Sequence, residues 1–171
     1  LAMIKEAYKV NNLVLKKGEP EKLTKRFIYY YKNNCLQKST LYPYALETLH
    51  TLKSANFKLV LVSNKPEYFV KKILKHFKIN NYFCAISGGD TFNFRKPDTR
   101  HLTETIKMTK IKNYRCWFIG DSKNDALCAR SIGAKLILLK HGYSKENILN
   151  LGADYVLNDL KEVSNIVINN N

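Results

Sequence analysis

The sequence predicts an α/β fold in which a parallel β-sheet carries helices on both faces. From residue 41 onward, short apolar runs of strand length alternate with amphipathic helical segments. Such alternation is typical of parallel strands joined by helical crossovers. Before residue 40 no strand-like run occurs. We therefore predict a Rossmann-like α/β core at residues 41–171, preceded by a separate helical segment at residues 1–40.

Residues 1–38 have a helical pattern throughout. Apolar side chains recur at helical spacing on both sides of a turn at 17–20. This turn places Pro20 at the start of the second helix, where a missing backbone N–H costs little. Nothing in this segment offers a set of catalytic side chains.

Five short apolar runs are expected to form the strands. They are continuous rather than alternating, as in strands that are buried on both faces, and they lie at 58–62, 83–86, 116–119, 135–139 and 152–157. Helices are expected around 46–52, 69–77, 99–110, 126–132, 145–150 and 159–168. A loop is expected at 141–143.

The run at 116–119 ends at Gly120 and is followed by two carboxylates, Asp121 and Asp125. In open α/β sheets, ligands bind just beyond the C-terminal ends of the strands. Two acids one helical turn apart point the same way, which suits a hard cation such as Mg²⁺. The alternative is a helix cap with a second acid in the first turn.

Polar residues also follow two earlier strands. Ser63 ends the first strand, and Lys96 lies in the loop after the second. A hydroxyl at a helix N-terminus binds phosphate oxygens, and a lysine neutralises phosphoryl charge. The alternatives are a helix cap for Ser63 and a solvated surface position for Lys96. Their order on successive strands favours a phosphate site completed by a metal ion that polarises the phosphoryl group.

The formal net charge of +15 does not indicate a nucleic-acid-binding protein. The basic residues are 24 Lys against 5 Arg and are scattered over every segment, whereas nucleic-acid sites favour arginine and cluster on one face. A basic protein does attract small anions. The four cysteines form no metal-binding or CxxC spacing, as expected for reduced thiols of a cytoplasmic protein. No segment has membrane-spanning length.

Three motifs carry a resemblance to a known family. The segments 59–66 (LVLVSNKP), 88–98 (GGDT and RKPD) and 120–125 (GDSKND) resemble motifs II, III and IV of the haloacid dehalogenase-like hydrolase superfamily. The residues of all three motifs are most similar to those of the phosphoglycolate phosphatases. The resemblance covers 41–165 in motif order, and residues 1–38 resemble the later helices of the helical cap in that family.

The resemblance implies a role for each matching residue. Ser63 would hydrogen-bond the phosphoryl oxygens, with Asn64 beside it. Lys96 would stabilise an aspartyl-phosphate intermediate, so we expect it to act on charge rather than on folding. Asp121 would ligate Mg²⁺, and Asp125 would support that site through water. The implied activity is Mg²⁺-dependent hydrolysis of a small phosphorylated metabolite.

One motif of the family has no counterpart in this sequence. The nucleophile and the acid/base belong to an Asp-x-Asp pair ahead of the cap, but the only acids in 1–40 are Glu6, Glu19 and Glu21. The strand that bears this pair lies between the strands that end here at Ser63 and Gly120. We therefore expect the chain to lack its nucleophile and its middle strand, to be inactive alone, and to need a segment that a separate polypeptide could supply.

Other interpretations remain open at this point. The cap selects the substrate in this superfamily, so another small-molecule phosphatase or a phosphosugar mutase fits the same motifs. A catalytically inactive remnant also fits. A phosphoacceptor signalling domain combines acids, a hydroxyl and a lysine on parallel strands, but it needs its paired acids early, and here the hydroxyl and lysine come first.

Overall fold

A computed structural model of the chain describes residues 2–112, 114–140 and 147–170. The chain divides into two compact units, Leu1–Ser39 and Thr40–Asn171. Among the described residues, no helix is both long enough and apolar enough to cross a bilayer.

The first unit is helical, as expected. It consists of α1 (Ala2–Val10) and α2 (Glu19–Asn34). Gly18 precedes α2 with φ 78°, a left-handed conformation that glycine adopts readily. No residue of α2 is buried, and Phe27 and Tyr31 stack on each other with ring centroids 5.4 Å apart.

The second unit confirms the predicted α/β fold. All five expected strands are present, and helices alternate with them: α3 (Ala45–Ser54), β1 (Leu59–Val62), α4 (Glu67–His76), β2 (Phe83–Ser87), α5 (Arg100–Lys107), β3 (Trp117–Gly120), α6 (Lys123–Arg130), β4 (Lys135–Leu139), β5 (Tyr155–Leu157) and α7 (Val163–Asn169). Short 3₁₀ turns lie at Asn80–Tyr82 and Ile148–Leu151. The second of them takes the place of the later part of the helix expected at 145–150, whose residues 145 and 146 lie outside the described residues. The expected loop at 141–143 lies outside the described residues.

The strands form two parallel ladders rather than one. β1 pairs with β2, so that Val62 faces Ser87, and β3, β4 and β5 form the second ladder in that order. Within the described part of the chain, no ladder joins β1 to β3. The two ladders separate at the place where the resemblance puts an additional strand.

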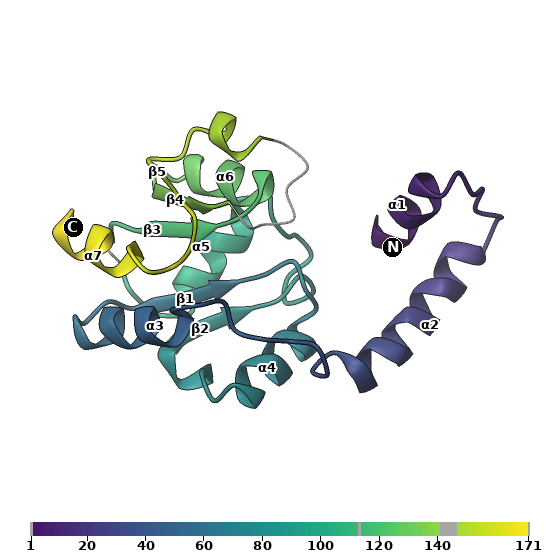
Figure 1. Cartoon of the computed structure of the whole chain (residues 1–171), viewed down its shortest axis with the longest axis horizontal. Helices are drawn as coiled ribbons and strands as arrows, with labels where there is room; N and C mark the ends of the chain where they lie inside the picture. Colours follow the sequence, from purple (N-terminus) through teal and green to yellow (C-terminus); the bar gives the residue numbers. More distant parts are fainter. Residues whose placement is uncertain (1, 113, 141–146, 171) are drawn as a thin grey trace. The chain divides into compact units, whose positions relative to one another are not determined.

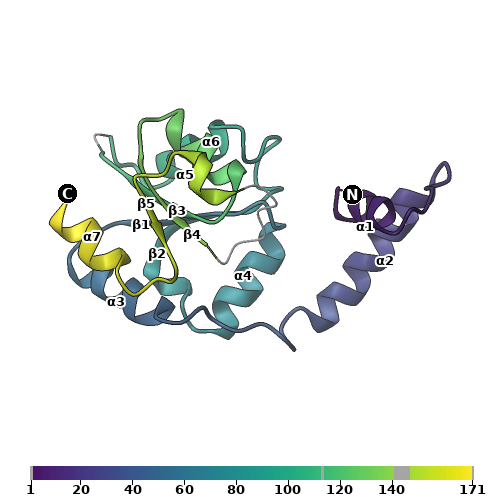
Figure 2. The ribbon, with the colours of Figure 1, turned by 45° about the horizontal axis from the view of Figure 1, so that its top comes forward.

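Helices cover both sides of the strands. α3, α4 and α7 lie on one side, and α5 and α6 lie on the other (Figures 1 and 2). Because side chains alternate along a strand, β4 contributes to both cores. Leu136 and Leu138 pack against α5 and α6, whereas Ile137 packs among residues of α3 and α7. None of these three side chains is more than 2% exposed.

Two helices also connect the ladders. Leu52 of α3 and Val163 of α7 share one apolar cluster with Leu59 of β1 and Trp117 of β3. All four residues of β1 are only half-buried, and Ile119 of β3 is 36% exposed. β1 and β3 are thus less enclosed than β4, which has a neighbouring strand on each side.

Candidate active site

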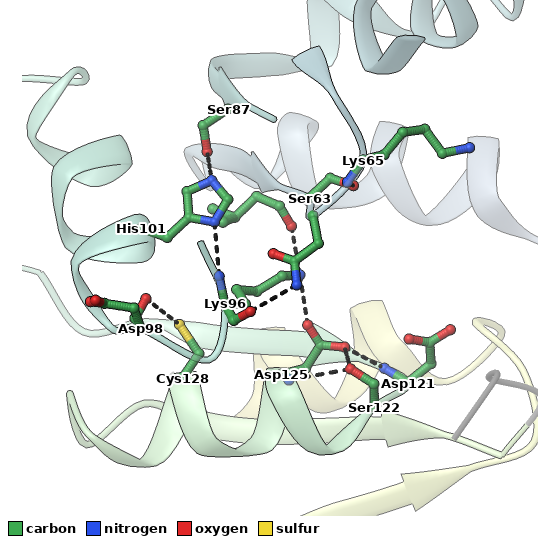
Figure 3. Close-up of polar contacts among 12 residues, drawn as sticks. Ser63, Lys65, Ser87, Lys96, Asp98, His101, Asp121, Ser122, Asp125 and Cys128 are labelled. Atoms are coloured by element: carbon green, nitrogen blue, oxygen red, sulfur yellow. Dashed lines mark hydrogen bonds and ion pairs between the residues drawn. The ribbon is translucent and has the colours of Figure 1, made fainter. Parts of the chain in front are cut away.

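The candidate site lies where β1 and β3 end. Parallel strands end at the same edge, and the polar residues that follow β1 and β3 therefore come together in space, as Figure 3 shows. They come from three places: the turn after β1, the loop between β2 and α5, and the start of α6.

Lys96 connects the two sides of this site. Its Nζ donates to the carbonyl oxygen of Val62 at 2.8 Å and to Oδ1 of Asp125 at 2.7 Å. Its side chain is only 12% exposed. Lys96 is therefore not a solvated surface lysine. The expectation that it acts on charge and not on folding does not fit this burial, because its ion pair ties the end of β1 to α6.

Asp125 is the most enclosed acid of the site, at 4% exposure. Its Oδ2 accepts hydrogen bonds from Ser122 Oγ at 2.6 Å and from the backbone N–H of Asp121 at 3.2 Å. Burial alone would raise the pKa of Asp125. The Lys96 ammonium and the hydrogen bonds from Lys96, Ser122 and Asp121 outweigh burial, so the pKa lies below its ordinary value. Asp125 is therefore ionised, and both of its carboxylate oxygens accept hydrogen bonds.

Asp121 has the opposite electrostatic environment. Burial, the negative charge of Asp125 and a hydrogen bond shared with it raise the pKa of Asp121, and only Lys96 and a backbone contact oppose them. Ser122, not Asp121, is the N-cap of α6. The two acids therefore do not share a helix face, as the spacing suggested, and the turn brings them together instead. Figure 3 shows the Asp121 carboxylate projecting beside that of Asp125.

This pair of acids fits a magnesium ion. A cation would relieve the repulsion that raises the pKa of Asp121, and Mg²⁺ commonly binds through one or two carboxylates, several waters and a substrate phosphate. Over residues 2–112, 114–140 and 147–170, no group of three or more His, Cys, Asp or Glu side chains could hold a metal. In this part of the chain, the carboxylates available for such an ion at the candidate site are those of Asp121 and Asp125.

The two residues after β1 have different surroundings. The Ser63 N–H donates to the carbonyl of Ser87 at 3.0 Å, and the Ser63 hydroxyl accepts from the Lys65 N–H at 3.2 Å. The Asn64 side chain donates through Nδ2 to the carbonyl oxygen of Lys96 at 2.8 Å. Its Oδ1 is buried without a hydrogen-bond partner. Asn64 thus joins the Lys96 loop directly, whereas the Ser63 hydroxyl stabilises its own turn.

Two glycines allow the site to be this compact. A Cβ at Gly120 would lie 2.5 Å from the Cβ of Asp125, and a Cβ at Gly89 would lie 2.3 Å from the carbonyl oxygen of Asn64. Both distances are shorter than any real Cβ contact. The close approach of α6 to β3, and of the β2 loop to the turn after β1, therefore requires glycine at these positions.

Sequence reasoning missed a buried polar cluster behind Lys96. Ser87, His101 and Thr105 are each 0% exposed and hydrogen-bond one another. The pKa of His101 is lowered by burial and by the charge of Lys96, which outweigh the Gly88 backbone and Asp98. The available signal was a histidine and a threonine four residues apart on the inward face of a helix.

A cavity of about 370 Å³ opens beside these residues. Lys96, Asp121 and Asp125 line it together with apolar side chains such as Ile119 and Leu139. Ser63 and Asn64 do not line it. This volume is within the range of small-molecule sites, and a few polar groups set in an apolar wall are typical of them.

Comparisons with known proteins show which family the chain resembles. The family model of the haloacid dehalogenase-like hydrolases matches residues 5–139. The phosphoglycolate phosphatase of Agrobacterium fabrum is 36% identical over 157 residues, 92% of this chain and 67% of that protein. The phosphoglycolate phosphatase of Haemophilus influenzae is 33% identical over 162 residues, 94% of this chain and 72% of that protein.

A solved structure is also similar over most of the chain. The crystal structure of a predicted phosphoglycolate phosphatase from Haemophilus somnus superposes with a TM-score of 0.86 at 29% identity, covering 95% of this chain and 73% of that one. The chain spans about two thirds of the length of the curated relatives it matches, with shares of 67%, 64% and 61% for three of them.

Proposed function

The chain belongs to the haloacid dehalogenase-like hydrolases, and on this premise we propose that it forms the C-terminal portion of a Mg²⁺-dependent phosphomonoester hydrolase of the phosphoglycolate phosphatase type. The observation that carries the proposal is the buried Lys96, which is bonded to the end of β1 and to Asp125 beside a cavity that Asp121 also lines. A cation held at this point faces any anion that enters the cavity.

The residues of this chain would divide the work of phosphoryl transfer among them. Lys96 would neutralise charge on the phosphoryl oxygens, and Ser63 would donate its hydroxyl proton to them from the turn after β1. Asn64, beside Ser63, would hold the Lys96 loop through its hydrogen bond to the Lys96 carbonyl. Asp121 would hold Mg²⁺ directly and Asp125 through water. The ion would supply further neutralisation of the phosphoryl charge when bound.

The reaction would pass through an aspartyl phosphate. An aspartate carboxylate attacks phosphorus, the bond to the alcohol oxygen of the substrate breaks, and the acid/base of the Asp-x-Asp pair that the resemblance implies gives its proton to the leaving alkoxide. Water then hydrolyses the acyl phosphate, which releases inorganic phosphate and regenerates the carboxylate. None of the acids in residues 1–40 is an aspartate. We infer that the nucleophile comes from a segment outside the printed sequence.

The separation of β1 from β3 supports a place for that segment. The residues of β1 are half-buried, and Ile119 on β3 is 36% exposed. A strand between them would pair with both edges and would direct the residues after its C-terminal end toward Lys96 and Asp121. The segment would belong to the same protein or to a separate polypeptide.

The proposed substrate is a small phosphorylated metabolite, with phosphoglycolate as the first candidate. The curated relatives carry that name, and Lys96 in the lining of the cavity offers a positive charge to an anionic ester. All four cysteines are free thiols. We propose a cytoplasmic location on this ground, because reduced thiols persist there.

Complementation tests this function. The chain is purified and mixed with the N-terminal segment of the Agrobacterium fabrum relative, and phosphate release from phosphoglycolate is measured with and without Mg²⁺. We expect activity only with both the segment and Mg²⁺. The matched control is a segment in which both aspartates of the Asp-x-Asp pair that the family resemblance implies are asparagine. Hydrolysis by the chain alone would contradict the inference that the nucleophile lies outside this chain. The proposed function would be contradicted if the chain, mixed with the segment and Mg²⁺, hydrolysed no small phosphate ester.

A further inference from the structure

A buried histidine holds the backbone of Lys96. His101 lies on α5 with 0% exposure, between the Lys96 loop and Ser87 at the end of β2. Figure 3 shows its ring joined to both. The Lys96 N–H lies 3.2 Å from Nδ1 of His101, and Ser87 Oγ lies 3.0 Å from Nε2.

The direction of each hydrogen bond follows from counting protons. The Thr105 hydroxyl donates its single proton to the carbonyl of His101, at 2.5 Å. Thr105 must then accept from Ser87, whose oxygen lies 2.6 Å away. Because the Ser87 hydroxyl donates its only proton to Thr105, its oxygen must accept a hydrogen bond from the Nε2–H of His101.

This leaves Nδ1 of His101 as an acceptor, which is what the N–H of Lys96 requires. The ring is consequently neutral and protonated at Nε2. A proton on Nδ1 would point at the Lys96 N–H, and two donors cannot form a hydrogen bond with each other. The lowered pKa of His101, caused by burial and by Lys96, agrees with the neutral form.

We propose that His101, as the Nε2-protonated neutral imidazole, is a positioning residue that fixes Lys96 for phosphoryl transfer. This role rests on the proposed function. Lysine carries its charge on a flexible four-carbon stem. The position of the ammonium group is fixed only if both the backbone and Nζ of the lysine are held by hydrogen bonds. Val62 and Asp125 hold Nζ, Asn64 holds the carbonyl, and His101 holds the N–H.

Two substitutions separate positioning from packing. In His101→Asn the amide oxygen occupies the place of Nδ1, so the variant keeps the acceptor for Lys96 and loses the bond to Ser87. In His101→Gln the terminal amide reaches the place of Nε2. The variant therefore keeps the hydrogen bond to Ser87 and loses the acceptor for the Lys96 N–H. Each variant removes one of the two ring hydrogen bonds, and both should lower the melting temperature to a similar extent.

Steady-state kinetics of the complemented enzyme give the first test. We expect kcat of His101→Gln to fall roughly 10- to 100-fold, because a misplacement of about 1 Å can cost 10²-fold in rate. KM should change little, and His101→Asn should retain kcat within about fivefold of the wild type. Equal losses in the two variants, or losses that follow their melting temperatures, would overturn the proposal.

The second test does not depend on activity. The chain contains four histidines, so ¹⁵N-histidine labelling with His101→Asn as the assignment control reports the tautomer of His101 directly. We expect a protonated Nε2 and an unprotonated Nδ1 near neutral pH. A protonated Nδ1 overturns the proposal even in an active enzyme. If the wild-type chain has the expected tautomer but stays inactive after complementation with the N-terminal segment and Mg²⁺, the hydrogen-bond assignment is supported and the proposed function is refuted.

Discussion

The two acids of the site should affect stability in opposite directions when each is changed to asparagine. Asp125→Asn places an amide against the Lys96 ammonium and leaves that charge buried without a counter-ion, since the paired side chains are only 12% and 6% exposed. Breaking one side of a buried ion pair costs about 3–5 kcal/mol. That is a large part of the 5–15 kcal/mol by which a typical domain is stable.

Asp121→Asn should have the reverse effect. Burial and the neighbouring charge of Asp125 raise the pKa of Asp121, so the ionised carboxylate destabilises the folded state. The backbone N–H of Asp121, which donates to Asp125, is unchanged by the substitution. Removing an unfavourable charge commonly adds about 0.5–2 kcal/mol, and we expect a gain near 1 kcal/mol in the absence of Mg²⁺.

Urea denaturation of the two variants and the wild type at pH 7, without divalent ions, measures both effects. The pH dependence gives an internal control. Because the folded-state pKa of Asp121 is raised, its stability contribution is present below the ordinary pKa of about 3.9 and is lost as pH rises through the raised value. The advantage of Asp121→Asn should therefore appear only as pH rises, and should disappear near pH 3.

The lowered pKa of Asp125 predicts the opposite pH dependence of stability. Its stabilising contribution is present above about pH 3.9 and is lost as pH falls through the lowered folded-state value. Asp125→Asn should thus approach the wild type only in strong acid. Two variants that are equally destabilised at pH 7, or an Asp125→Asn variant within 0.5 kcal/mol of the wild type, roughly the range of ordinary surface substitutions, would refute this account of the site.

Three further predictions follow from the same contacts. Gly120→Ala should cost about 1–3 kcal/mol in urea denaturation and abolish complemented activity, because its Cβ would lie 2.5 Å from the Cβ of Asp125. Lys96→Met should lower stability by about 3–5 kcal/mol, and combining it with Asp125→Asn should cost less than the sum of the two, as a double-mutant cycle would measure. The pKa of His101, which faces Lys96 and Asp98, is lowered, so its stabilising contribution should decline as pH falls below about 6.5, and this decline should be absent in His101→Asn.

The sequence predicts the core of this protein well because its strands are continuous apolar runs. All five expected strands are present, with bounds shifted by at most a few residues. Of the short helix expected at 145–150, the described part from 147 onward contains a 3₁₀ turn at Ile148–Leu151. Its pattern covers too few residues to distinguish one helix type from another.

The members of the candidate site were also predictable, but not their environments. The order of the motifs predicts that Asn64, Lys96, Asp121 and Asp125 lie at the edge where the strands end. The structure has these residues in contact there. Whether a lysine is solvated or buried depends on what packs around it, which no local pattern encodes. The position of Asp121 before the helix cap likewise follows from one Ser122 hydrogen bond rather than from spacing.

His101 was missed for a related reason. A lone histidine on an amphipathic helix has no distinguishing pattern, and its significance comes from residues in other elements. Ser87 ends β2 and Lys96 lies in the loop that follows it, so only the folded chain shows that one imidazole joins them. Direction of donation, which fixes the tautomer, is visible only when the whole chain of partners is known.

The position of Lys96 also bears on how the proposed additional strand would act. Lys96 is bonded on one side to Val62, the last residue of β1, and on the other to Asp125 beyond β3. A strand inserted between β1 and β3 would therefore pair with both edges and, in the same step, deliver its C-terminal residues to this lysine. Folding and chemistry would be coupled: a segment present at 100 times its dissociation constant adds about 2.7 kcal/mol of stability. An Asn-x-Asn segment should supply that stability in full and restore no activity, because strand pairing uses the backbone and only the reaction needs the carboxylate.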